Sequence, residues 1–262
     1  MINMNEDNLI KYYNKFNEDK RLKTRHGKVE FITSIKYIDK YLKKFKNPKI
    51  IDIGAGTGAY SIYLEEKGYD VTAVELIKHN LKVIEQKNKN IKLFQGNAIN
   101  LSKFKSNYYD LVILFGPMYH LITKDEKIKA LEEAKRITKK NGIIFIQYCM
   151  NDYAVITHGF IDNKISESIN KNKIDKNYHI ISDKKDLYSY VTFKEINELK
   201  KISGLKRIKI FNPDGPSNYI RSSLNKLSEE EFNKFIEYNL TICEKKELLG
   251  ASYHIVDVLK KI

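Results

Sequence analysis

The stretch Lys49-Ile-Ile-Asp-Ile-Gly-Ala-Gly-Thr-Gly-Ala-Tyr60 decides the fold of this chain. Its first half, three isoleucines around Asp52, predicts a short buried strand, because β-branched side chains pack well on a pleated surface. Three glycines, each separated by one residue, follow, and an apolar helical pattern begins at Tyr60. A strand, a glycine turn and a helix in this order bring the backbone close to a bound nucleotide, since a Cβ would block both the turn and the ligand. We therefore expect a nucleoside cofactor at this turn.

The glycine spacing and a later acid distinguish between kinds of nucleotide turn. A dinucleotide-binding turn has the pattern G-x-G-x-x-G. This chain has G-x-G-x-G, with Ala59 where the third glycine of that pattern belongs. Glu75 ends the second predicted strand, about twenty residues after Gly54, where a carboxylate can accept hydrogen bonds from both ribose hydroxyls. The alternatives are a glycine turn without a ligand and a Glu75 that caps the next helix.

Length and composition bound the class of protein. The chain has 262 residues, of which 42% are hydrophobic, enough for one large α/β domain with insertions. No apolar run reaches the roughly 18 residues that span a bilayer, and the polar N-terminus is unlike a secretory signal. The two cysteines, Cys149 and Cys243, have no metal-type spacing, which favours reduced thiols in a cytoplasmic protein without a metal or a membrane partner.

The net charge of +14 raises the question of a nucleic-acid partner. The lysines are spread along the whole chain, and the few basic pairs fall mostly near predicted helix ends, where cations suit the helix dipole. We interpret the charge as a solvated surface and disfavour a nucleic-acid partner. Composition leaves a monomer and a homodimer equally open.

Apolar strands alternating with helical patterns predict the sheet. A near-continuous apolar strand indicates a parallel sheet covered on both faces, so we expect an α/β, doubly wound, mostly parallel seven-stranded sheet with helices on both faces. Thr123, Thr192 and Ser228 each open a helix with a capping box. A further helix is expected at 28–45. The expected strands are 50–53, 69–74, 91–95, 108–114, 143–148, 205–211 and 251–259.

The chain divides into four segments by pattern. Residues 1–47 are expected to form an N-terminal helical lid, and 48–150 the cofactor-binding core. The periodicity weakens over 151–191, which we interpret as a cap insertion over the carboxyl ends of the strands, where open α/β sheets bind ligands. Residues 192–262 are expected to complete the core, with a helical insertion between the last two strands.

With these elements in order, the chain resembles the class I S-adenosylmethionine-dependent methyltransferases, whose fold is Rossmann-like. The pattern Asp52-x-Gly54-x-Gly56-x-Gly58 is similar to the first motif of that class. The run Leu-Phe-Gly-Pro-Met-Tyr-His-Leu at 114–121 resembles the Gly-Pro-x-Tyr-His-Leu motif of a bacterial small-molecule branch. Similar segments occur at Arg21-Leu22, at 29–31 and at 249–254.

The resemblance implies how S-adenosylmethionine is held. The glycine turn faces the methionine and ribose, and Glu75 accepts hydrogen bonds from the ribose hydroxyls. Asn97 stands where this class often has an aspartate, and its side-chain oxygen can still accept a hydrogen bond from the adenine amino group. N-terminal residues cover the cofactor, where an arginine could pair with its carboxylate. The implied cofactor-binding residues are Tyr13, Arg21, Arg25, Asp52, Gly54, Ala55, Gly56, Gly58, Glu75, Leu76, Asn97, Ala98, Phe115 and Gly116.

Methyl transfer from a sulfonium is an in-line displacement to which the protein mainly contributes proximity and alignment. A hydroxyl or ammonium acceptor must also lose a proton, and His120, just past strand four, is the candidate base. The alternative is a ring that locks the loop by hydrogen bonds. His158, His179 and His254 are weaker candidates, and His254 is expected to be a satisfied interior or edge residue. The candidate substrate residues, each of which could equally lie in the core, are Tyr119, His120, Tyr148 and Tyr153.

The sequence therefore predicts a cytoplasmic methyltransferase that moves a methyl group from S-adenosylmethionine to an oxygen or nitrogen of a small molecule and releases S-adenosylhomocysteine. Two alternatives stay open. One is an RNA or protein methyltransferase, and the other is a non-catalytic protein that binds S-adenosylmethionine.

Overall fold

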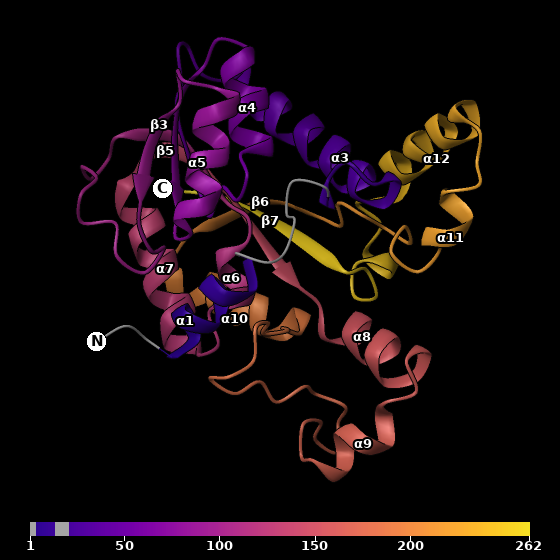
Figure 1. Ribbon diagram of the computed structural model, residues 1–262. Coiled ribbons are helices and arrows are strands. Elements are labelled where there is room, and N and C mark those ends of the chain that lie inside the picture. The colour runs from indigo at the N-terminus through magenta and orange to yellow at the C-terminus, as the bar shows by residue number, and fades with distance from the viewer. Residues whose placement is uncertain (1–3, 14–20) are drawn as a thin grey trace.

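The computed structural model describes residues 4–13 and 21–262, so parts of the expected N-terminal lid lie outside the described residues. Seven strands form one sheet in the order β3-β2-β1-β4-β5-β7-β6 (Figure 1). The first five pair in parallel, whereas β7 runs antiparallel to both neighbours, so the predicted doubly wound, mostly parallel sheet is confirmed. The strands are β1 (Lys49–Ile53), β2 (Asp70–Glu75), β3 (Lys92–Gln95), β4 (Tyr109–Leu114), β5 (Thr138–Cys149), β6 (Lys206–Phe211) and β7 (His254–Lys260).

Helices cover both faces of the sheet. The strands alternate their side chains between two apolar cores, one under α3 (Arg25–Leu42), α4 (Ala59–Glu66) and α5 (Lys78–Lys87). The other core lies under α7 (Lys124–Ile137) and α10 (Phe193–Ser203). Because both faces of each central strand are buried, the strands read as continuous apolar runs rather than alternating ones.

The predicted helix starts are mostly correct. Capping boxes at Thr123, Thr192 and Ser228 open α7, α10 and α12 (Glu229–Ile242), so these three predictions are confirmed. The helix predicted at 28–45 begins three residues earlier, because the hydroxyl of Thr24 accepts the backbone N–H of Gly27 and so caps α3. Helix α12 and the short α11 (Arg221–Leu224) pack against α3 through a third apolar cluster (Figure 1).

The last strand is shorter at its start than predicted. It begins at His254 rather than at residue 251, because the Ser252 hydroxyl bonds both the Leu249 and the His254 carbonyls and so holds a turn. The 3₁₀ turn η2 (Lys246–Leu248) precedes it. Strand β5, by contrast, begins at Thr138, five residues before the predicted 143.

The segment after β5 projects away from the sheet at the carboxyl ends of the strands (Figure 1). It contains α8 (Asn151–Ala154), the π-helix η1 (Val155–Ile161) and α9 (Ile165–Asn170). It then returns to the sheet, where the Val191 N–H donates to the Cys149 carbonyl at 2.9 Å. Across residues 4–13 and 21–262, no helix combines the length and the apolar character that crossing a membrane requires.

Candidate functional site

A cavity of about 530 Å³ opens at the carboxyl ends of β1, β2 and β4. Its walls come from the glycine turn, the ends of β2 and β3, the loop after β4 and the N-terminal helix α1 (Met4–Tyr13). Most residues predicted for the cofactor or the substrate line this one space. They are Tyr13, Arg21, Asp52, Gly54, Ala55, Gly56, Glu75, Leu76, Asn97, Ala98, Phe115, Gly116, Tyr119 and His120.

Two glycines form the floor where β1 and β4 end. Gly54 has φ +75°, and a Cβ there would lie 2.5 Å from Cδ of Pro117. Gly116 has φ +106°, and a Cβ on it would stand 3.5 Å from the Gly54 carbonyl oxygen. Both backbones adopt conformations that glycine tolerates best, and the two strand ends approach closely. The turn is therefore a cradle that side chains would fill.

Glu75 presents a buried carboxylate to the cavity. Its Oε2 accepts the Gly56 N–H and its Oε1 the Ile77 N–H, each at 2.9 Å. Burial raises the pKa of Glu75 to about 7 against the opposing effect of these amides. The Asn80 amide also donates to Oε1 at 3.5 Å, so Oε2 is the oxygen that can accept a further hydrogen bond from a ribose hydroxyl. The carboxylate thus fits a nucleoside.

Two neighbours of Glu75 complete this end of the cavity. Asp52 is buried behind the turn, where its Oδ2 accepts the Ser61 hydroxyl at 2.6 Å. Burial raises the pKa of Asp52 to about 6. Asn97 also lines the cavity, and its Oδ1 accepts the Ile99 N–H at 3.1 Å.

His120 ends the short helix α6 (Pro117–His120), and both of its ring nitrogens are hydrogen-bonded. Nδ1 lies 2.8 Å from the Leu187 carbonyl oxygen. Because a carbonyl only accepts, Nδ1 carries the hydrogen, and Nε2 accepts from the Tyr13 hydroxyl at 2.8 Å. Burial lowers the pKa of His120 to about 4, so the ring is neutral at pH 7 and a weak base.

The segment that follows β5 is tied to the loop that carries His120. The Ser189 N–H donates to the Tyr119 carbonyl at 2.7 Å. The ammonium of Lys127 bonds the Ser189 hydroxyl at 2.7 Å and the Leu121 carbonyl. Burial lowers the pKa of Lys127 to about 8. Lys127 was not predicted as part of the site, although a lysine on the apolar face of a helix is unusual and is visible in the sequence.

Four predicted residues lie elsewhere. Arg25 is turned to the C-terminal helices, where it bonds the Leu224 and Leu227 carbonyls and pairs with Glu229. Arg25 therefore does not line the cavity, where it was expected among the cofactor-binding residues. Three others do not line the cavity, because Gly58 caps α4, Tyr148 is buried in the core and Tyr153 stacks on Tyr253 at 4.5 Å.

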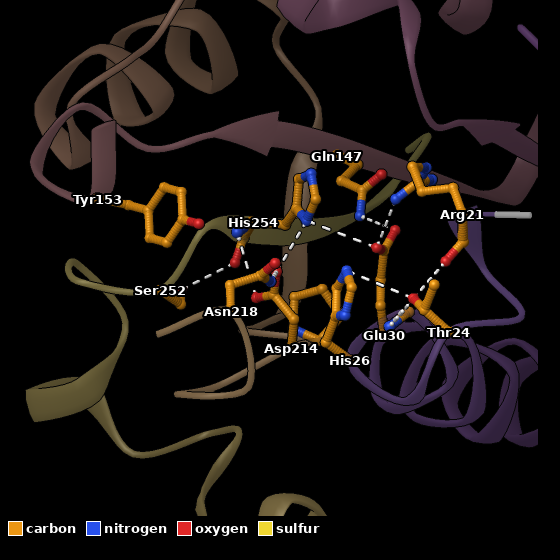
Figure 2. Close-up of polar contacts among 12 residues, drawn as sticks. Arg21, Thr24, His26, Glu30, Gln147, Tyr153, Asp214, Asn218, Ser252 and His254 are labelled. Atoms are coloured by element: carbon orange, nitrogen blue, oxygen red, sulfur yellow. Dashed lines mark hydrogen bonds and ion pairs between the residues drawn. The ribbon is translucent and has the colours of Figure 1, made fainter. Parts of the chain in front are cut away.

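A largely buried polar network adjoins the cavity, which its members Arg21 and Gln147 line (Figure 2). The carboxylate of Glu30, on α3, accepts a hydrogen bond from the Arg21 guanidinium at 2.8 Å and another from the Gln147 amide nitrogen at 3.0 Å. Its Oε2 lies 3.7 Å from Nδ1 of His254, which in turn is 2.9 Å from Oδ2 of Asp214. His254 is confirmed as a satisfied interior residue. The network itself was not predicted, because its members are scattered along the chain.

Comparison with known proteins agrees with this geometry. Residues 51–146 match the family described as a methyltransferase domain. A demethylmenaquinone methyltransferase of Paenarthrobacter aurescens is 34% identical over 98 residues, 37% of this chain and 37% of that protein. A ribosomal RNA small subunit methyltransferase A of Wigglesworthia glossinidia brevipalpis is 34% identical over 119 residues, 42% of this chain and 45% of that protein. The chain thus spans less than half the length of these relatives.

A solved structure from Thermotoga maritima extends the likeness to the whole fold. It is described as a SAM-dependent methyltransferase, possibly a histamine N-methyltransferase. It superposes with a TM-score of 0.58 at 17% identity and covers 100% of both chains. The chain therefore has the fold of the class I S-adenosylmethionine-dependent methyltransferases, and its residues 51–146 match a methyltransferase domain. S-adenosylmethionine is the cofactor of this class.

Proposed function

We propose that the protein transfers a methyl group from S-adenosylmethionine to an oxygen or nitrogen of a small molecule and releases S-adenosylhomocysteine. The observation that carries the proposal is the shared cavity. Four separate segments bring to it a glycine cradle, a buried carboxylate, an amide oxygen and the glycine loop after β4. In this order, we match these groups to the methionine part, the ribose, the adenine and the sulfur of S-adenosylmethionine.

The residues divide the work of holding the cofactor. Gly54 and Gly56 leave room for the methionine part, Glu75 accepts a ribose hydroxyl, and Asn97 with Ala98 borders the adenine. Bound there, the cofactor supplies a methyl carbon activated by its sulfonium. The protein then has to align the acceptor with that carbon and exclude water. We assign this task to the N-terminal helical lid and the cap insertion, which meet around His120.

A small acceptor suits the dimensions of the site. Small-molecule sites occupy roughly 300–1,000 Å³, and the cavity of about 530 Å³ would hold both the cofactor and the acceptor, which favours a small acceptor. Tyr13 and His120 both line the cavity, and the hydrogen bond between them narrows the end that we assign to the acceptor. Two buried cysteines without a disulfide agree with the cytoplasmic location that we propose.

Calorimetry with S-adenosylhomocysteine tests the cofactor, and transfer of labelled methyl tests the reaction. The purified protein should bind S-adenosylhomocysteine at the site of Glu75. With methyl-labelled S-adenosylmethionine, it should place the label in the small-metabolite fraction of a cell extract. If the folded protein did not bind S-adenosylhomocysteine, the cofactor assignment and with it the proposed function would be contradicted.

An RNA acceptor is the second candidate, favoured by the net charge of +14 and by the ribosomal RNA methyltransferase among the relatives. It predicts label in the RNA fraction, and RNA binding that weakens steeply as salt rises from 50 to 200 mM, as counterion release requires. Binding of the cofactor with label in no fraction would instead indicate a non-catalytic protein.

A further inference from the structure

The segment that follows β5 exposes an unusual number of large apolar side chains. Within residues 4–13 and 21–262, twelve large apolar side chains are exposed, and half of them lie between residues 156 and 181. Single exposed apolar residues are normal on a protein surface, but a concentration in one short segment is rare in a monomer. The six side chains of this segment are Ile156, Phe160, Ile161, Ile169, Tyr178 and Ile181.

The helix η1 places three of the six on one side. It is a π-helix, in which the Lys164 N–H donates to the carbonyl of Gly159, five residues earlier, at 2.8 Å. Residues four and five apart in such a helix lie on the same side. The side chains brought together are Ile156, Phe160 and Ile161, which are 37%, 57% and 64% exposed, and we call these three the apolar face.

The rest of η1 is packed, so the apolar face stands on an ordered support. Val155 and Gly159 are buried. A Cβ at Gly159 would lie 3.1 Å from Cδ1 of Ile165, so the glycine allows the start of α9 to pack closely on η1. Figure 1 shows that this part of the chain projects away from the sheet, where another molecule can reach it.

The charge of the segment differs from that of the rest of the chain. Residues 151–191 contain six acidic residues and six lysines, so their net charge is zero, and the other 221 residues carry the whole net charge of +14. The charges next to η1 pair within the segment, since Glu167 contacts Lys171 at 2.6 Å and Lys164 at 3.3 Å. The apolar face therefore lies in an electrically neutral part of a basic protein.

This charge distribution indicates which partner fits the apolar face. A nucleic acid, an anionic membrane or an acidic protein would be attracted to the basic parts of the chain rather than to the neutral segment. Two copies of the chain repel each other through their basic parts but can meet through the neutral segment without that cost. An apolar centre with a polar rim is the usual composition of an interface, and a twofold axis brings one such surface onto an identical one.

We propose that the protein forms a twofold homodimer in which the apolar faces of two copies pack against each other. This inference goes beyond the proposed function and does not depend on it. Because the contact is apolar, salt leaves the attraction in place and screens the repulsion between the two basic chains. The dimer should therefore become tighter as the salt concentration rises.

Sedimentation velocity of the full chain tests the dimer. We expect a species of twice the chain mass to appear as the protein concentration rises from about 1 to about 100 μM. Its dissociation constant should fall between about 50 and about 500 mM salt. A wild-type protein that stays monomeric over this range would overturn the proposal, as would a dimer that weakens with salt. A monomer that floats with uncharged phosphatidylcholine vesicles would show that a membrane covers the face instead.

Two serine variants test the apolar face itself. Phe160→Ser and Ile161→Ser change side chains that are more than half exposed in the single chain, so both variants should fold, as thermal melting by circular dichroism will show. The matched controls are Tyr238→Ser, 52% exposed on α12, and Ile202→Ser, 50% exposed on α10. We expect each of the first two to raise the dissociation constant at least about tenfold, because one substitution changes the interface twice, and the controls to match the wild type. Equal dissociation constants in all four variants would overturn the proposal.

Discussion

The hydroxyl of Tyr13 lies 2.8 Å from Nε2 of His120, so the end of the N-terminal helix meets the loop after β4 across 107 residues of sequence. The carbonyl of Leu187 holds the opposite nitrogen of the same ring. The imidazole is thus held between helix α1 and the segment that follows β5. This favours the interpretation of His120 as a ring that locks the loop, with Tyr13 beside it at the cavity.

Replacing Tyr13 with phenylalanine should lower methyl transfer while leaving cofactor affinity nearly intact. The variant keeps the ring and removes one hydrogen-bonding oxygen, so we expect a roughly tenfold lower kcat/KM for the acceptor, equivalent to about 1.4 kcal/mol. Tyr238→Phe, on the exposed face of α12, is the control and should match the wild type. A large loss of affinity for S-adenosylhomocysteine in Tyr13→Phe would show that Tyr13 serves the cofactor instead.

Cofactor binding should weaken in acid because of Glu75. Its pKa is about 7 in the free protein, and a ribose hydroxyl that donates to it would favour the ionised form in the complex. A ligand that prefers the ionised form loses affinity as pH falls below that value, so the Kd for S-adenosylhomocysteine should rise about tenfold between pH 8 and pH 6. Calorimetry at several pH values measures this change.

The variant Glu75→Gln separates this effect from general acid sensitivity. It should bind S-adenosylhomocysteine weakly at every pH and lose most of the pH dependence. Glu85→Gln, exposed on the adjacent α5, should retain the wild-type profile. A pH profile unchanged in Glu75→Gln would direct attention to Asp52, the other buried carboxylate of the turn, whose pKa burial raises to about 6.

The parts of the site that the sequence predicted are local in the chain. The glycine turn, Glu75 at the end of the next strand and the loop that contains Gly116 follow from short patterns, because parallel strands bring their carboxyl ends to one edge of the sheet. The helix starts were equally local, since a capping box is read from four consecutive residues. Such features need no knowledge of distant contacts.

The residues that escaped prediction depend on contacts between distant segments. Glu30 and Gln147 meet across 117 residues, and nothing near either one marks the partnership. Arg25 and Tyr153 lie outside the cavity for the converse reason. Each is a plausible ligand-binding residue by type, but Arg25 bonds to the C-terminal helices and Tyr153 stacks on Tyr253. Residue type indicates what a side chain can do, and tertiary packing decides where it does so.

The buried network should be far more sensitive than a surface ion pair. In Glu30→Gln, Arg21 and His254 would lose the charge between them, and breaking a buried pair in this way costs roughly 3 kcal/mol. Glu229→Gln removes the 76%-exposed partner of Arg25 and should cost less than about 1 kcal/mol. Urea unfolding of both variants measures the difference. Equal midpoints would show that Glu30 contributes no more than a surface charge.

Lys127 should hold the cap insertion in place. Lys127→Met keeps the length of the side chain but removes the hydrogen bonds to Ser189 and to the Leu121 carbonyl. We expect faster proteolytic cleavage within 171–186 and weaker methyl transfer, with little change in affinity for S-adenosylhomocysteine. Lys129→Met, exposed on the same helix, should be cleaved at the wild-type rate. Equal cleavage of the two variants would show that the insertion is held by other contacts.

Two glycines with similar backbones allow a matched test of the cofactor cradle. Gly54 and Gly68 have φ of +75° and +85°, so alanine at either position carries a backbone penalty of about 1–2 kcal/mol. A Cβ at Gly68 would meet nothing within 4 Å, whereas one at Gly54 would lie 2.5 Å from Pro117. Gly54→Ala should therefore lose a further 1–3 kcal/mol, roughly, through overpacking, and at least about tenfold in affinity for S-adenosylhomocysteine. Gly68→Ala should keep that affinity, and an equal loss in both variants would show that backbone strain alone controls binding.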